Sequence, residues 1–180
     1  MSKDSVPPFS LIRQFERPRF YTGRLLMAAD LQDDQDYFRE KIRLHNRLLH
    51  GWGVVTGLRV SECAGTLTVS AGLALDCAGN ELVLAEAKHT ALSNVAAKQY
   101  VTIQYVEVPT GQQPSASGDA QFSKIREDVR VEITSTDPAS GHGGSAVTVA
   151  CGVDHPLCLA TIRLYGSTWR ISIRRRRLSK

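Results

Sequence analysis

The feature that most constrains the fold is a change in hydrophobic spacing at Gly51. Before it, the apolar residues Leu31, Phe38, Ile42 and Leu49 recur at helical intervals. After it, apolar residues alternate with polar ones in short runs that are broken by glycine and proline. The first pattern is typical of an amphipathic helix and the second of half-buried strands. The sequence therefore predicts an α+β protein in which one long helix precedes a β-domain.

Residues 30–50 hold the predicted helix. Asp30 is a suitable N-cap, because its carboxylate can accept hydrogen bonds from free amide groups of the first turn. Acidic side chains gather early in the stretch and basic ones late, an order that complements the helix dipole. Gly51 stands where a glycine often ends a helix. We expect the helix to be about 30 Å long and to bury its apolar stripe on the β-domain.

Residues 51–180 predict an antiparallel β-sandwich or barrel of about eight short strands. Gly53 and Gly57 serve the sharp exit from the helix into the first strand, and Asp76 and Gly79 lie in a tight turn. Gly79 and Asn80 are the expected positive-φ positions of that turn. The candidate strands are 54–60, 67–75, 82–84, 100–108, 129–135, 147–151, 157–165 and 168–173.

Three segments lack a clear pattern of either kind. Residues 1–29 predict an extended N-terminal arm, which carries a few apolar side chains that a partner could bury. Residues near 109–124 and 136–146 are rich in Gly, Ser, Pro and Gln, and predict mobile loops.

The formal net charge of +4 is modest, and much of it lies in the C-terminal tail. That tail could contact phosphates, but no aromatic residues are interleaved with it for base stacking. We therefore expect no nucleic-acid partner. The basic residues of the tail are Arg174, Arg175, Arg176, Arg177 and Lys180.

The sequence has no apolar run near the 18 residues that a membrane span needs, so we expect no membrane insertion. The first residues contain no apolar region typical of a Sec-type signal peptide. We expect a protein that is made and kept in the cytoplasm, or exported by a route other than Sec.

A metal site is a weak candidate. Cys151, His155 and Cys158 form a Cys-x3-His-x2-Cys cluster, and zinc prefers four nitrogen or sulfur ligands. The spacing matches no standard zinc motif, so we favour isolated buried or loop cysteines and expect no cofactor. The residues that could supply a fourth ligand are Cys63, Cys77 and His142.

Catalytic patterns are absent from the sequence. His45 and His50 lie about 140° apart around a helix, so they cannot chelate one ion from one face. No phosphate-binding loop or nucleophile elbow occurs. Asp76 and Glu81 could form a carboxylate pair, but acidic residues in a turn commonly make local hydrogen bonds. We expect no enzymatic activity.

Several segments together resemble a known group of proteins. They include Phe-Tyr-Thr-Gly-Arg-Leu-Leu at 20–26, the stretch 30–60, Gly-x-Ala-x-Asp-x-x-Gly-x-Glu at 72–81, Ser-Lys-Ile-Arg-Glu-Asp at 123–128, and Pro-Leu-Cys-Leu-Ala at 156–160. These segments are similar to mostly uncharacterised bacterial and phage proteins encoded with contractile tails and extracellular contractile injection systems. The resemblance covers most of residues 20–175.

The resemblance implies a structural or assembly component of a phage-tail-like particle, in the baseplate or fibre region, with no catalytic residues. Its partners would be other subunits of the particle, and a homo-oligomer is compatible with this role. The arginine-rich tail departs from the pattern and could mark a docking contact. From the helix itself, we predict that Arg39, Arg43 and Arg47 meet a partner subunit.

Two alternatives stay open. One is a module of the tail-fibre type that binds carbohydrate or a cell-surface ligand, for which Trp169, Tyr105 and Tyr165 would be the aromatic residues. The other is a small adaptor stabilised by a metal ion.

Overall fold

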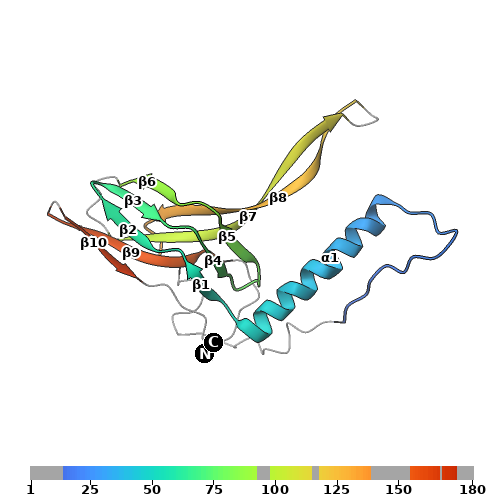
Figure 1. Ribbon diagram of the computed structural model, residues 1–180, viewed down its shortest axis with the longest axis horizontal. Helices are drawn as coiled ribbons and strands as arrows, with labels where there is room; N and C mark the ends of the chain where they lie inside the picture. Colours follow the sequence, from blue (N-terminus) through green and yellow to red (C-terminus); the bar gives the residue numbers. More distant parts are fainter. Residues whose placement is uncertain (1–13, 93–97, 115–117, 139–154, 167, 174–180) are drawn as a thin grey trace, which may run out of the picture.

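The computed structural model describes residues 14–92, 98–114, 118–138, 155–166 and 168–173. The described chain is mostly β-structure with one helical segment, so the predicted α+β class is confirmed (Figure 1). The helical segment is α1 (Ala28–His45), which continues into a short π-helix, η2 (Asn46–His50). The strands are β1 (Gly53–Gly57), β2 (Val60–Cys63), β3 (Thr66–Val69), β4 (Gly72–Leu75), β5 (Glu81–Leu84), β6 (Lys88–Ala91), β7 (Gln99–Pro114), β8 (Ala120–Thr134), β9 (Leu157–Tyr165) and β10 (Thr168–Ile173).

The strands form three antiparallel sheets with the orders β1-β4-β5, β2-β3-β6 and β10-β9-β7-β8. Aliphatic side chains from all three sheets meet in one core, and β2 lies against β10 while β5 lies against β7 and β8. Each sheet has two edges, so the described strands do not form a closed barrel, which was one of the two architectures that the sequence allowed. The candidate strand at 147–151 lies outside the described residues.

Two predicted strands each divide between two sheets at one crossing. The chain leaves β1 for β2 after Gly57 and leaves β3 for β4 before Gly72, and these two glycines face each other in register. A Cβ on Gly57 would lie 2.1 Å from the carbonyl O of Ala71, and one on Gly72 would lie 2.4 Å from that of Thr56. Only glycine permits so close an approach of two backbones.

The turn between β4 and β5 is built around a buried carboxylate. Asp76 accepts hydrogen bonds from the backbone N–H and the side-chain Nδ2 of Asn80, both over 2.8 Å. Gly79 has a φ of +89°, as predicted, whereas Asn80 is not among the residues with positive φ. Asn80 is instead held by its two bonds to Asp76, so the expected pair of positive-φ residues is reduced to one.

The predicted loop over 109–124 is wrong for the residues that the structure describes there. β7 and β8 pair along their whole length, out to Pro114 opposite Ala120. β9 pairs with β7 only from Gln99 to Ile103, so the distal part is a two-stranded hairpin that projects from the β-domain (Figure 1). Both faces of this hairpin meet solvent, and its sequence therefore lacks the alternation by which a half-buried strand is recognised. Residues 136–138 precede a stretch outside the described residues, so most of the second predicted loop lies there too.

The helix begins two residues earlier than predicted, and Asp30 is not its N-cap. Met27 takes that position, and Asp30 lies in the first turn, where its Oδ2 accepts from the backbone N–H of Met27 over 3.0 Å. The same carboxylate forms an ion pair with Arg24. A carboxylate in this place still satisfies an otherwise free amide and complements the dipole. Asp30 thus ties the end of the N-terminal arm to the helix.

Candidate interaction surfaces

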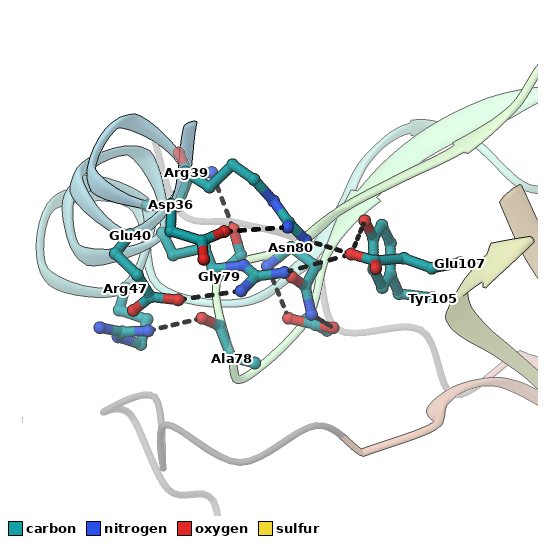
Figure 2. Close-up of polar contacts among 12 residues, drawn as sticks. Asp36, Arg39, Glu40, Arg47, Ala78, Gly79, Asn80, Tyr105 and Glu107 are labelled. Atoms are coloured by element: carbon teal, nitrogen blue, oxygen red, sulfur yellow. Dashed lines mark hydrogen bonds and ion pairs between the residues drawn. The ribbon is translucent and has the colours of Figure 1, made fainter. Parts of the chain in front are cut away.

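The helix is attached to the β-domain near its C-terminal end, where it meets the β4–β5 turn. Asn46 is 6% exposed, and its Nδ2 donates to the carbonyl O of Gly79 over 3.0 Å. Arg47 donates from a guanidinium nitrogen to the carbonyl O of Ala78 over 2.7 Å (Figure 2). A Cβ on Gly79 would lie 2.3 Å from the carbonyl O of Arg43, so helix and turn are in direct backbone contact.

A cluster of charged side chains continues the attachment one turn earlier along α1. Arg39 forms an ion pair with Glu107 of β7 and lies 3.5 Å from Asp36. Arg43 lies 2.9 Å from Glu40 and 3.9 Å from Glu107, so Arg39 and Arg43 both approach the carboxylate of Glu107. The polar side of α1 therefore faces this chain's own β-domain.

Tyr105 completes the cluster, because its O–H donates to Glu107 over 3.0 Å. Partial burial, and next the hydrogen bond to Glu107, raise the pKa of the Tyr105 hydroxyl well above its usual value of 10.0. Burial is the largest single influence on the pKa of Arg39 and works to lower it, but Glu107, Tyr105 and Asp36 together outweigh burial and the net shift of the pKa is upward. The cluster holds fixed charges and a neutral phenol, an arrangement suited to positioning a helix.

The three arginines predicted to meet a partner are thus engaged within the chain. Arg39, Arg43 and Arg47 contact Glu107, Glu40 and the β4–β5 turn respectively, and their predicted role toward another subunit stays a prediction. Sequence reasoning missed Asn46, since a polar residue on a helix is ordinarily assigned to solvent. Glu107 was also missed, because nothing local to β7 indicates what faces it.

The apolar side of α1 is largely exposed among the described residues, which overturns the expectation that it packs on the β-domain. Within the described chain no residue of α1 is buried, and Leu31, Phe38 and Ile42 are 54%, 57% and 54% exposed. Leu49 in η2 is 70% exposed. Amphipathicity identified the apolar face correctly but not what lies against it. An apolar surface of this length on a folded protein is typical of an interaction site.

The opposite flank of α1 carries the end of the N-terminal arm. The ring of Phe15 packs edge-on against Tyr37 with centroids 6.2 Å apart, and Lys41 lies 5.1 Å from the centre of the Phe15 ring. A hollow of about 550 Å³ separates the arm from the helix and is lined by polar side chains from both. The part of the arm that the structure describes, from residue 14 onward, is thus laid along α1 on a side other than its apolar face.

A second hollow, of about 800 Å³, lies between α1 and the β7–β8 hairpin. The helix contributes Gln32, Gln35 and Arg39, and the hairpin contributes Phe122 and Ile125 among other residues. Both of these apolar side chains are 59% exposed. Two elements that project in the same direction thus present open surface between them (Figure 1).

Other predicted site residues are scattered or lie outside the described chain. Cys151 and Arg174–Arg177 are outside it, so neither the Cys/His cluster nor the basic tail can be placed. Among the described residues, no three potential metal ligands come together, and no helix is long and apolar enough to cross a membrane.

The aromatic residues proposed for a surface ligand are divided between two places. Tyr105 lies at the helix attachment beside Arg39 and Gly79, whereas Tyr165 lines a different hollow next to Arg170 of β10. The guanidinium carbon of Arg170 is 5.2 Å from the centre of the Tyr165 ring. The described structure therefore does not unite Tyr105 and Tyr165 into one platform.

No protein-family model and no curated protein sequence matches the chain. Its fold, however, is similar to that of solved baseplate proteins. A crystal structure of TssK aligns with 88% of this chain and 41% of its own length, with a TM-score of 0.52 and 12% identity. A chain of the TssK-TssF-TssG baseplate subcomplex of the type VI secretion system aligns with 89% of this chain and 60% of its own, at a TM-score of 0.51 and 10% identity.

A chain of the baseplate complex from the type VI secretion system gives a TM-score of 0.51 and 11% identity, covering 89% of this chain and 58% of that one. This protein therefore spans about two fifths to three fifths of the length of the chains whose fold it shares. At such low identity the similarity establishes a shared fold. That shared fold includes both the helix and the β-domain.

Proposed function

We propose that this protein is a non-enzymatic structural subunit of the baseplate of a contractile injection system and acts by protein–protein contact. The observation that carries the proposal is the shared fold: almost nine tenths of the chain aligns with proteins of type VI secretion baseplates, and type VI secretion is itself a contractile injection system. The sequence resemblance to proteins encoded with contractile tails points independently to the same class of particle.

The surface of the molecule supports an assembly role. An uncovered apolar helix face and a projecting two-stranded hairpin offer extended surface to neighbouring subunits, as assembly proteins require. The charged groups of the attachment cluster neutralise one another within the chain. On this proposal, the protein is made in the cytoplasm and functions in the assembled particle, with other baseplate subunits as its partners.

Affinity purification of the tagged chain from the organism that encodes it tests the proposal. We expect baseplate and sheath proteins to co-purify, and particles to be incomplete in electron micrographs when the gene is deleted. Normal, functional particles in the deletion strain would overturn the structural role.

A further inference from the structure

The exposed residues of α1 follow a regular spacing in the sequence, unlike those of a general apolar patch. Its residues recur alternately at four and three positions: Leu31, Gln35, Phe38, Ile42 and His45. Leu49 in η2 continues the spacing. An average repeat of 3.5 is the spacing by which helices pack into left-handed coiled coils. All six residues are exposed, and we call them the heptad seam.

Within the described chain, no residue of the seam is buried, although Gln35 and Ile42 at its edge line hollows that also involve the β-domain. At about 100° per residue, the directions of Leu31, Phe38 and Ile42 fall within about 40° of one another. Tyr37, which contacts the arm, lies about 100° to one side of Phe38, and Arg39, which contacts the β-domain, lies about 100° to the other. The described part of the arm and the β-domain therefore flank the seam on opposite sides, and the β-domain comes nearest to it at Gln35 and Ile42.

We infer that the heptad seam pairs with the same seam of a second copy of this chain, forming a parallel coiled coil. Each copy presents a preformed helix that is already held by Asn46, Arg47 and the charged cluster, so pairing does not have to order the helix. That matters because fewer than three heptads would be marginal for free peptides. The inference does not rest on the proposed function, since it concerns only contacts between copies.

Charges beside the seam favour the parallel direction. If Gln35 and Ile42 take a positions and Phe38 a d position, Asp34 is a g residue and Arg39 an e residue. In a parallel pair, g of one helix faces e five residues later on the other, so Asp34 comes near Arg39 of the second copy, which also keeps its ion pair with Glu107 of its own chain. An antiparallel pair centred between Phe38 and Ile42 would bring Arg39 near Arg39 and Lys41 near Lys41, which is unfavourable.

Polar residues within the seam also select its register. Gln35 at an a position is buried between the copies, and its amide is hydrogen-bonded there only if it meets Gln35 of the second copy. A shift by one heptad would set Gln35 against Ile42 and leave the amide without a partner.

The apolar surface also extends beyond the start of α1, because Leu25, Leu26 and Met27 are exposed.

Measuring the molar mass by light scattering over a concentration series tests the inference. We expect the wild-type protein to have a multiple of 19.8 kDa and Phe38→Asp to have the monomer mass. Phe38 is 57% exposed, so the variant should keep the circular dichroism spectrum of the folded chain. Val83→Asp changes an equally exposed residue on β5 and should keep the wild-type mass. A wild-type monomer at all concentrations, or a Phe38→Asp protein of wild-type mass, would overturn the inference.

A cysteine cross-link tests the direction in a Cys63→Ser background, which removes an exposed thiol. Gln35→Cys should form a disulfide between copies under mild oxidation, whereas Asp33→Cys, on the flank of α1 that faces the arm, should not. In the antiparallel arrangement residue 35 would lie opposite residue 45, and two copies of residue 35 would be about 15 Å apart. An oligomer without the Gln35→Cys cross-link would therefore contradict the parallel pairing. A failed mass test leaves the baseplate role to the co-purification experiment, so the two outcomes are separable.

Discussion

The β-domain and α1 are held by opposite kinds of interaction. The β-domain is built on aliphatic residues that are withdrawn from water, among them Leu82, Ile103 and Ile162, each with no exposed surface. α1 has no buried residue among its 18, and the β-domain holds it through ion pairs of α1 itself and through hydrogen bonds of η2, which continues it. Burial of one large aliphatic side chain is worth roughly 1.5–3 kcal/mol, and an exposed ion pair only about 0–1 kcal/mol. The β-domain is thus stabilised by burial of apolar side chains, whereas the helix is held in place by polar contacts.

The largest difference in the free energy of unfolding should appear between substitutions of two neighbouring residues on β5. Leu82 is fully buried, whereas Val83 on the other face of the same strand is 55% exposed. Leu82→Ala should lower the free energy of unfolding by about 2–5 kcal/mol, because it leaves a cavity in the core. Val83→Ala should lower it by about 1 kcal/mol or less. Urea unfolding measures both, and equal losses would contradict the description of the core.

The attachment itself is tested by a pair of glycines with similar backbone angles. A Cβ placed on Gly79 (φ +89°) would press on Arg43 of the helix, whereas one placed on Gly65 (φ +78°) would meet nothing within 4 Å beyond its chain neighbours. Alanine at either site incurs a backbone cost of about 1–3 kcal/mol, and only Gly79→Ala also pushes the helix away. We expect Gly79→Ala to be the more destabilising and to increase amide exchange in α1. Unchanged exchange in α1 would show that the contact does not hold the helix.

The ion pair between Arg39 and Glu107 should contribute far less. Their side chains are 34% and 32% exposed, so we expect a coupling free energy of about 0.2–1 kcal/mol in a double-mutant cycle with alanine. The coupling should decrease as salt is added, because screening acts on partly exposed charges. A coupling that is zero at low salt would mean that the two charges do not fix the helix.

The smallest expected effect is an alkaline loss of stability at Tyr105. Its pKa in the folded chain lies above the usual 10.0, so the folded state holds the phenolic proton more tightly than the unfolded state does. The associated stabilisation is complete below pH 10 and is lost as the pH rises through the folded pKa. Between about pH 9 and pH 11, Tyr105→Phe should therefore lose less stability than the wild type. Identical losses in urea titrations would argue against the raised pKa.

The sequence predicted the elements better than their surroundings. The helix, the antiparallel strands and the turn at Asp76 were recognisable because each has a local signal: a period of 3.6, a period of 2, and turn residues at fixed spacing. The face of the helix that meets the β-domain was not recognisable from the sequence, because a local pattern cannot tell an arginine that faces Glu107 from one that faces water. Asn46 was missed for the same reason.

Two further errors came from treating each segment by itself. The glycines at 57 and 72 look like separate interruptions, and only their register reveals a single crossing between sheets. The β7–β8 hairpin has polar residues on both faces of its distal part, so its strands resemble a loop. In each case the determining interaction lies with a segment distant in sequence, which composition and period do not record.

The crossing at Gly57 and Gly72 has a consequence for how the molecule comes apart. Both connections pass through the same point, so the sheet β1-β4-β5 and the sheet β2-β3-β6 share two continuous stretches of backbone. Neither sheet can open without disturbing the hydrogen-bonded ladder of the other. Under mechanical load the β-domain should therefore yield in a single event, after the helix has already peeled away at much lower force.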